Sequence, residues 1–235
     1  MATTNCFLQR YRKAQLWFCV AAAIVSGSPI SVTHAEVADD SLRVYAVNIL
    51  RHPKEPWTGY GIYLGNGFVI SAAHVVGRSF LTRPSVFIAG LDLSAKVIKE
   101  GSFDDVDLTL LSIDQEKLPI SLRLRRLSIC EKAPWLGELV IVAIPESTAR
   151  SHVISPQFLP PKLRVKFGTV IGDVASTGNS GSGVFDANRK CLLGIMSRKI
   201  QMPVRIGPRS EYKDLAKYFV PASELRAFIP IESRF

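Results

Sequence analysis

The sequence predicts an all-β protein with one short helix near its C-terminus. About a dozen short segments rich in β-branched and aromatic residues follow one another, and turn-forming residues recur roughly every eight to twelve positions. No helical pattern separates these segments, as the crossovers of a parallel α/β sheet would require. The pattern favours a β-sandwich or β-barrel, and a chain of 235 residues, 47% of them hydrophobic, can bury a large core.

Each expected strand is an apolar run bounded by turn residues. In the first half of the chain, these runs span residues 42–50, 60–64, 67–71, 86–89, 95–98 and 108–113. Gly65-Asn66-Gly67 has the composition of a hairpin turn between two of them.

In the second half of the chain, strands are expected over residues 139–144, 163–171, 191–197 and 217–220. Several serines and prolines predict a loop over residues 146–162, and residues 201–212 are expected to be irregular. The closing helix is expected over residues 224–229, with Ser223 as its N-cap.

The first 35 residues have the features of an export signal. Basic residues lie at positions 10–13, an apolar run of about ten residues follows at 16–25, and Ala35 supplies a small residue before a plausible cleavage site. We therefore expect a signal peptide over residues 1–35, one domain over residues 36–235, and a periplasmic or secreted protein. An uncleaved anchor is the alternative, although the run is short for a membrane span.

Cysteine content and charge narrow the expectations further. Cys130 and Cys191 remain after the signal, and two cysteines in an exported domain predict a disulfide, with two free buried thiols as the alternative. Neither has histidine or cysteine neighbours at ligand spacing, so no metal site is expected. The net charge is +9, but the sequence contains no block of basic residues with aromatic residues between them. Nucleic acid is therefore not an expected partner.

Two polar residues stand out in apolar surroundings. His74 lies directly after a strand in the sequence Ala72-Ala73-His74-Val75-Val76, and Asp107 directly precedes the apolar run at 108–113. A buried carboxylate beside an imidazole would orient the ring and stabilise its protonated form. Taken singly, the histidine is more typical of a packed core residue, and the aspartate of a solvated turn residue or helix cap.

Ser180 lies in the glycine-rich stretch 177–185. Glycines on either side allow a sharp turn that leaves the N–H groups of Gly178 and Ser180 free to point at one spot. Acyl transfer needs a hydroxyl that attacks a carbonyl and two donors for the resulting oxyanion. A Gly/Ser-rich hairpin or linker is the alternative for this stretch alone. It is not the elbow of an α/β-hydrolase, since Ser182 occupies the second glycine position of that motif.

Together, the three motifs resemble those of the chymotrypsin-fold, trypsin-like serine peptidases, in particular the compact bacterial domains of the HtrA type without a PDZ module. The order His74, Asp107, Ser180 and the intervals of 33 and 73 residues are also similar. The resemblance spans residues 42–229, and 55 residues after Ser180 leave no room for a PDZ module.

The resemblance implies two six-stranded antiparallel β-barrels, over about residues 42–118 and 130–220, with a cleft between them and a short C-terminal helix. It implies that Ser180 is the nucleophile, His74 the general base and then acid, and Asp107 the residue that orients His74. Gly178 and Ser180 would supply the oxyanion N–H groups. The implied substrate is a polypeptide, and no metal or organic cofactor is implied.

The resemblance also suggests residues for the primary specificity pocket. Val174, Met196 and Ser197 correspond to pocket positions, and because none is charged, we expect small or medium apolar side chains to be accepted. Arg198 and Lys199 at the rim could instead favour acidic side chains.

Two departures from the family pattern affect the serine loop. Gly181-Ser182-Gly183 follows the serine where the family usually has a proline in third place, which loosens the backbone without removing a reacting group. Asn179 stands where zymogen-type relatives carry an aspartate that pairs with a newly freed N-terminus. We therefore expect no activation by N-terminal insertion.

The leading hypothesis is an exported serine endopeptidase that works through a Ser-His-Asp triad and an acyl-enzyme. One alternative is a catalytically silent binding module of the same fold in the cell envelope. Another is a basic envelope protein that binds anionic surfaces.

Overall fold

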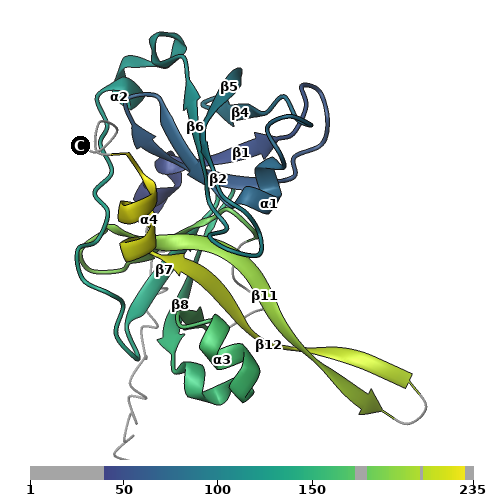
Figure 1. The fold of residues 1–235 in the computed structure, drawn as a ribbon. Helices are drawn as coiled ribbons and strands as arrows, with labels where there is room; N and C mark the ends of the chain where they lie inside the picture. Colours follow the sequence, from purple (N-terminus) through teal and green to yellow (C-terminus); the bar gives the residue numbers. More distant parts are fainter. Residues whose placement is uncertain (1–39, 173–178, 207–208, 231–235) are drawn as a thin grey trace, which may run out of the picture. The chain divides into compact units, whose positions relative to one another are not determined.

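The computed structural model describes residues 40–172, 179–206 and 209–230. Within these residues the chain forms two closed six-stranded β-barrels in which all neighbouring strands pair antiparallel (Figure 1). The expected all-β fold with two barrels is therefore confirmed. The expected signal peptide, Val174 and Gly178 lie outside the described residues. No helix in the described part is long and apolar enough to cross a membrane.

The first barrel has the strand order β1-β2-β3-β6-β5-β4. Inward side chains such as Ile49, Tyr63 and Leu111 are fully buried in its core. The turn between β2 and β3 has a positive φ at Gly65, Asn66 and Gly67, as its glycine and asparagine content predicted. The strands are β1 (Ala46–Leu50), β2 (Gly59–Gly65), β3 (Phe68–Ser71), β4 (Ser85–Ile88), β5 (Leu91–Glu100) and β6 (Thr109–Ile113).

The second barrel has the order β10-β11-β12-β9-β8-β7. Its core contains Val184, Leu193 and Phe219. The strands are β7 (Leu139–Ala143), β8 (Thr148–Ile154), β9 (Val170–Ile171), β10 (Gly183–Asp186), β11 (Leu192–Ile206) and β12 (Arg209–Pro221).

Short helices connect the strands and close the chain. Helix α4 packs its buried Leu225 and Phe228 into a hydrophobic cluster that also contains residues of both barrels, among them Ile62 and Phe185. This shared cluster holds the two barrels together. The helices are η1 (Asp40–Tyr45), α1 (Ala73–Val76), η2 (Gln115–Lys117), α2 (Ile120–Arg123), η3 (Pro156–Phe158), α3 (Pro161–Lys166) and α4 (Ala222–Phe228).

Several local expectations were wrong. The segment 42–45 is part of η1, so that only 46–50 is strand. Residues 146–162 hold strand β8, in which only Ser151 and Val153 are buried, so its polar composition resembles that of a loop. Of the strand expected over 163–171, only Val170–Ile171 is strand, and residues 163–166 belong to helix α3, which begins at Pro161 because a proline at the first helical position is compatible with helix initiation.

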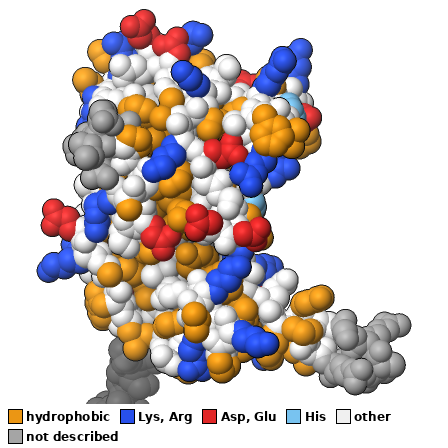
Figure 2. All heavy atoms as spheres, in the orientation of Figure 1, with side chains coloured by type: hydrophobic (Ala, Val, Ile, Leu, Met, Phe, Trp, Pro, Cys, Tyr) orange, Lys and Arg blue, Asp and Glu red, His pale blue; other side chains and the backbone are white. Residues whose placement is uncertain are grey.

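The C-terminal third differs from expectation at two further places. Residues 201–206 and 209–212, which lie in the segment expected to be irregular, belong to a long hairpin in which β11 and β12 stay paired from Gly194 with Pro221 to Ile206 with Arg209. The outer part of this hairpin projects from the barrel as an arm with hydrophobic side chains on its surface (Figures 1 and 2). Helix α4 begins at Ala222 after Pro221, so Ser223 is not its N-cap.

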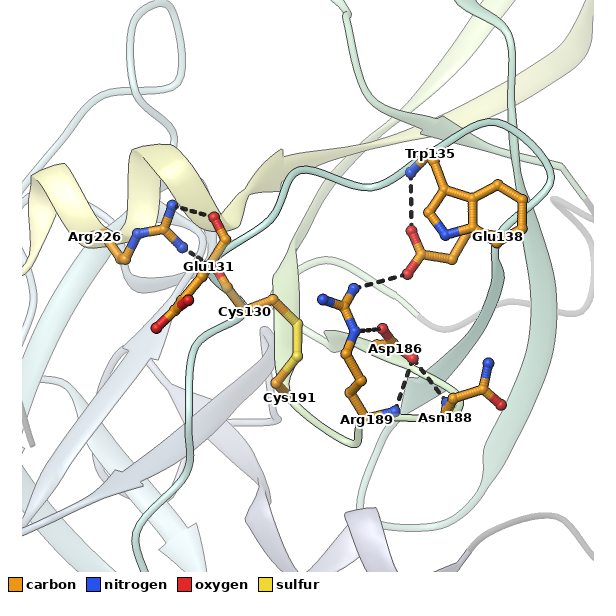
Figure 3. The surroundings of a disulfide bond; sticks show 9 residues. All are labelled: Cys130, Glu131, Trp135, Glu138, Asp186, Asn188, Arg189, Cys191 and Arg226. Carbon is orange, nitrogen blue, oxygen red and sulfur yellow. Dashed lines mark hydrogen bonds and ion pairs between the residues drawn. A yellow bond between two sulfur atoms is a disulfide. The ribbon is translucent and has the colours of Figure 1, made fainter.

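The expected disulfide is present. Cys130, in the segment that connects the two barrels, is bonded to Cys191 at the start of β11, and their Cα atoms are 5.1 Å apart (Figure 3). Arg226 of α4 donates to the carbonyl oxygens of both Cys130 and Glu131 (Figure 3). The bond therefore attaches the interbarrel segment to the second barrel next to α4.

Near the disulfide, two buried carboxylates and a partly exposed arginine hold the turn between β10 and β11. Asp186 accepts from the N–H groups of Asn188 and Arg189 at 2.7 and 2.9 Å and from the Arg189 guanidinium (Figure 3). Glu138 accepts from the same guanidinium at 3.2 Å and from the N–H of Trp135 at 2.9 Å. The two buried carboxylates therefore share one arginine and fix the hairpin that follows the serine loop.

Removal of the disulfide should destabilise the protein without unfolding it. Closing a loop of this size contributes roughly 2–4 kcal/mol, so we expect Cys130→Ala/Cys191→Ala to lower the free energy of unfolding by about that amount in urea denaturation. Wild-type protein treated with a reductant is the matched comparison and should behave in the same way. Two alkylatable thiols in the unreduced wild-type chain of residues 36–235, which contains only Cys130 and Cys191, would contradict the assignment.

Candidate active site

His74 is held in place by a single helical turn. Helix α1 follows β3 directly, and its Val75 and Val76 are buried while the His74 side chain is 28% exposed. The guanidinium of Arg51 donates to the carbonyl oxygens of His74 and Val75, which satisfies groups that so short a helix leaves open. The buried valines thus anchor the helical turn in the core, while the His74 imidazole points outward.

Asp107 binds both the ring and the backbone of His74. Its Oδ2 lies 2.8 Å from His74 Nδ1, and its Oδ1 accepts the His74 backbone N–H at 3.0 Å. The carboxylate is 1% exposed. When Nδ1 carries the proton toward Asp107, Nε2 is left as an acceptor, which is the arrangement required of a general base.

Ser197 contributes a further hydrogen bond to Asp107. Its hydroxyl is fully buried and donates to Asp107 Oδ2 at 2.5 Å. Burial has the largest effect on the Asp107 carboxyl and by itself would raise its pKa. The hydrogen bonds from His74 and Ser197 outweigh burial and bring the pKa of Asp107 below its ordinary value. The carboxylate is therefore charged at neutral pH, where it can stabilise an imidazolium.

Sequence reasoning assigned Ser197 to the pocket and missed its contact with Asp107. The two residues are 90 positions apart in the chain, and only the docking of β11 beside the first barrel brings them together. Met196 is 1% exposed and packs in the core of the second barrel. Both side chains therefore face the protein interior, and Val174 lies outside the described residues.

The two cations beside the site already have partners. The Arg198 guanidinium carbon lies 3.5 Å from the Phe103 ring centroid, and Nη2 is 3.9 Å from Asp107 Oδ2. Lys199 forms an ion pair with Asp214 at 3.0 Å.

Phe103 also borders the histidine. Its ring contacts the His74 ring edge-on, with centroids 5.1 Å apart. A cavity of about 160 Å³ opens beside these rings, lined among others by Gly77, Arg78 and Glu100. The imidazole thus has an apolar wall on one side and an open recess next to it.

Ser180 is linked to Asp107 by hydrogen bonds through Ser197. Its hydroxyl donates to the Ser197 carbonyl oxygen at 3.0 Å, while the Ser197 hydroxyl binds Asp107. Among the hydrogen bonds of the described residues, none joins Ser180 to His74. The backbone N–H of Ser180 donates to no described residue, and Gly178, the other expected oxyanion donor, is outside the described part of the chain.

Gly181 lets the serine loop fit against the first barrel. Its φ is +87°, and a Cβ there would lie 1.8 Å from the Tyr60 carbonyl oxygen and 2.8 Å from Ser71 Oγ. Its N–H donates to the Met196 carbonyl oxygen at 2.8 Å. The glycine after the serine is therefore required by a close backbone approach as well as by its conformation.

No known protein-family profile matches this sequence, and no curated protein is significantly similar to it. Solved structures do match. Neuropsin, a serine protease expressed in the limbic system of mouse brain, superposes with a TM-score of 0.57 at 14% identity, covering 79% of this chain and 92% of that one. The MamO protease domain from Magnetospirillum magneticum, in its apo form, superposes with a TM-score of 0.54 at 18% identity, covering 80% of this chain and 97% of that one.

The Rv3671c protease from M. tuberculosis, in its active form, gives a TM-score of 0.52 at 17% identity and covers 80% of each chain. These likenesses, together with the two closed barrels, show that the chain has the chymotrypsin fold. At such identities the likeness concerns the fold alone.

Replacing Ser197 by alanine should destabilise the protein in a pH-dependent way. A hydrogen bond to a charged group contributes roughly 1.5–3 kcal/mol, and we expect Ser197→Ala to lower the free energy of unfolding by that amount near pH 7. The lowered pKa of Asp107 stabilises the folded state above the unfolded carboxyl pKa of about 3.9, and this stabilisation is lost as the pH falls further. Urea denaturation should therefore show the two proteins converging below about pH 4.

Ser85→Ala is the matched control for this variant. Ser85 is also buried, but its hydroxyl has no hydrogen-bond partner among the described residues, so its removal should change stability little at any pH. An equal effect of both substitutions would show that Ser197 does not stabilise the carboxylate.

Gly181→Ala should lower the free energy of unfolding far more than Gly90→Ala. Both glycines have a positive φ, +87° and +79°, but nothing lies within 4 Å of a Cβ at Gly90. The strain of the conformation alone costs about 1–2 kcal/mol, which we expect for Gly90→Ala in urea denaturation. Gly181→Ala adds a collision with the Tyr60 carbonyl and should cost clearly more. Equal costs would mean that the loop can move away from Tyr60.

Proposed function

We propose that this chain is an exported serine endopeptidase that uses Ser180, His74 and Asp107 as its catalytic triad. The observation that carries the proposal is the double role of Ser197, whose hydroxyl binds the carboxylate that orients His74 while its carbonyl holds the Ser180 hydroxyl. Ser197 thus links the proposed nucleophile to the carboxylate that binds the proposed base, on a fold that solved serine proteases share.

In the proposed reaction, the Ser180 side chain first turns from the Ser197 carbonyl toward Nε2 of His74. Nε2 takes the hydroxyl proton as Oγ attacks the peptide carbonyl carbon, and Asp107 stabilises the imidazolium that forms. The oxyanion is stabilised by the N–H groups of Ser180 and Gly178. The C–N bond then breaks, His74 gives its proton to the leaving amine, and water hydrolyses the acyl-enzyme by the same route.

Export is supported by two independent features. The N-terminal 35 residues have the composition of a signal peptide. The disulfide between Cys130 and Cys191 fits an oxidising compartment, since such bonds are rare in reducing ones. We propose a periplasmic or secreted location and a polypeptide substrate.

Labelling by a fluorophosphonate probe tests the proposed nucleophile. The mature chain, residues 36–235, should be labelled at Ser180, as mapped by mass spectrometry. Ser180→Ala should abolish labelling, and His74→Ala should slow it by on the order of 10²-fold or more, because the hydroxyl loses its base.

Ser182→Ala is the control within the same loop. The Ser182 hydroxyl is buried and donates to the Asn179 carbonyl oxygen at 2.6 Å, so it should not react, and this variant should still be labelled at Ser180. No labelling of a folded wild type would overturn the proposal and favour a silent binding module. Salt-dependent binding to vesicles without labelling would favour a basic envelope protein that binds anionic surfaces.

A further inference from the structure

Arg198 lies beside the candidate active site with most of its side chain buried. It belongs to β11 of the second barrel, and its side chain is only 15% exposed. Its guanidinium carbon lies 3.5 Å from the centroid of the Phe103 ring, and Nη2 donates to the Phe103 carbonyl oxygen. Phe103 lies between β5 and β6 of the first barrel. One arginine therefore joins the second barrel to the ring that borders His74.

An irregularity in β11 brings Arg198 to this place. Successive side chains of a regular strand point to opposite faces. The hydroxyl of Ser197 and the guanidinium of Arg198 nevertheless both lie near Asp107 Oδ2, at 2.5 and 3.9 Å. The register of β11 against β12 shifts between Met196 and Arg198, so that the pairing skips Ser197. Because such an extra residue changes the direction of the side chains next to it, two neighbours of one strand can approach the same carboxylate.

The residue type fits the position. A guanidinium is planar, stacks on aromatic rings and carries its N–H donors in a fixed fork. Besides the bond to the Phe103 carbonyl, Nε donates to the Ser197 hydroxyl oxygen at 3.3 Å. The ring of Phe167, ahead of β9, lies 5.7 Å from the guanidinium carbon. A lysine has no planar fork, and an apolar side chain has no donor for the carbonyl.

The loop that contacts the arginine also carries Asp107. It spans residues 101–108, and the N–H of Gly101 donates to the Leu108 carbonyl oxygen at 2.8 Å, which joins the ends of the loop. Phe103 is 42% exposed, so packing in the core does not by itself fix its ring. The guanidinium supplies a stacking contact and a hydrogen bond at this exposed position. Displacement of the loop would move the ring away from the histidine and disturb the carboxylate that orients it.

We propose that Arg198 is a positioning residue that clamps the loop between β5 and β6 and so keeps Phe103 against the imidazole of His74. The clamp also fixes Asp107, which lies in the same loop. This inference rests on the proposed role of His74 as the base. In this role Arg198 takes no proton and touches no reacting atom, because it acts through the loop that it holds.

The first test compares fluorophosphonate labelling rates of the mature chain, residues 36–235. Arg198→Met keeps an unbranched side chain but removes the guanidinium. We expect labelling to slow about tenfold, which corresponds to the loss of one partly buried cation–π contact. Arg125→Met is the matched control, because the Arg125 guanidinium also lies over a ring, that of Tyr45 at 5.9 Å, outside the site. The control should keep the wild-type rate, and equal slowing of both variants would reject the clamp.

A double-variant cycle tests whether Arg198 acts through Phe103. Phe103→Ala removes the ring and should itself slow labelling. Arg198→Met/Phe103→Ala should be slowed clearly less than the product of the two single effects, because residues that act through one contact are not additive. Effects that multiply would show that the two residues act independently and would overturn the proposal. Urea denaturation confirms that each variant is folded before its rate is compared.

Hydrogen exchange followed by proton NMR keeps the clamp testable if the wild type is not labelled. His74 offers Asp107 its backbone N–H, at 3.0 Å from Oδ1, and its ring Nδ1, at 2.8 Å from Oδ2. The protons on these two nitrogens should exchange with water about tenfold faster in Arg198→Met than in wild type or Arg125→Met. Amides of the β1–β2 pair should be unchanged, whereas a general loss of stability would accelerate them as well and would contradict a local clamp.

The two measurements separate the clamp from the proposed function. Faster exchange at His74 alone, in a folded wild type that is not labelled, would support the clamp and reject the peptidase proposal. Unchanged exchange and an unchanged labelling rate in Arg198→Met would reject the clamp while leaving the peptidase proposal intact.

Discussion

The arrangement of the candidate site depends on the buried carboxylate of Asp107, which needs hydrogen-bond donors around it. A charge removed from water is tolerated only where donors surround it, and here the donors come from two different parts of the fold. The backbone and ring of His74 belong to the first barrel, and the hydroxyl of Ser197 belongs to β11 of the second. Satisfying one carboxylate therefore couples the placement of the histidine to the docking of the two barrels.

The serine loop is fitted to the same junction by backbone contacts. Gly181 allows the loop to approach Tyr60 of β2, and the Ser180 hydroxyl is bound to the carbonyl of Ser197. A hydrophobic cluster shared by both barrels and α4 keeps these surfaces together. Close packing across the junction allows groups that are far apart in sequence to be placed within hydrogen-bond distance.

Local sequence predicted the fold where burial imposes a clear pattern. The β2–β3 hairpin was predicted from two short apolar runs and the Gly-Asn-Gly turn between them. Strand β8 was not, because only two of its seven residues, Ser151 and Val153, are buried. Residues 201–204 and 211–214 of the β11–β12 hairpin include no buried residue, so burial imposes no pattern on them. Helix α3 was missed because its apolar residues suit a strand equally well.

The sequence by itself determined which chemical groups are available: a histidine after a strand, an aspartate before another, a serine among glycines, and two cysteines for one bond. Only the tertiary structure decided their partners. The role of Ser197 beside Asp107 and the contacts of Arg198 with Phe103 depend on where β11 lies against the first barrel. The physical reason is that residue type and spacing constrain local conformation, whereas a hydrogen bond across 90 residues depends on the packing of whole barrels.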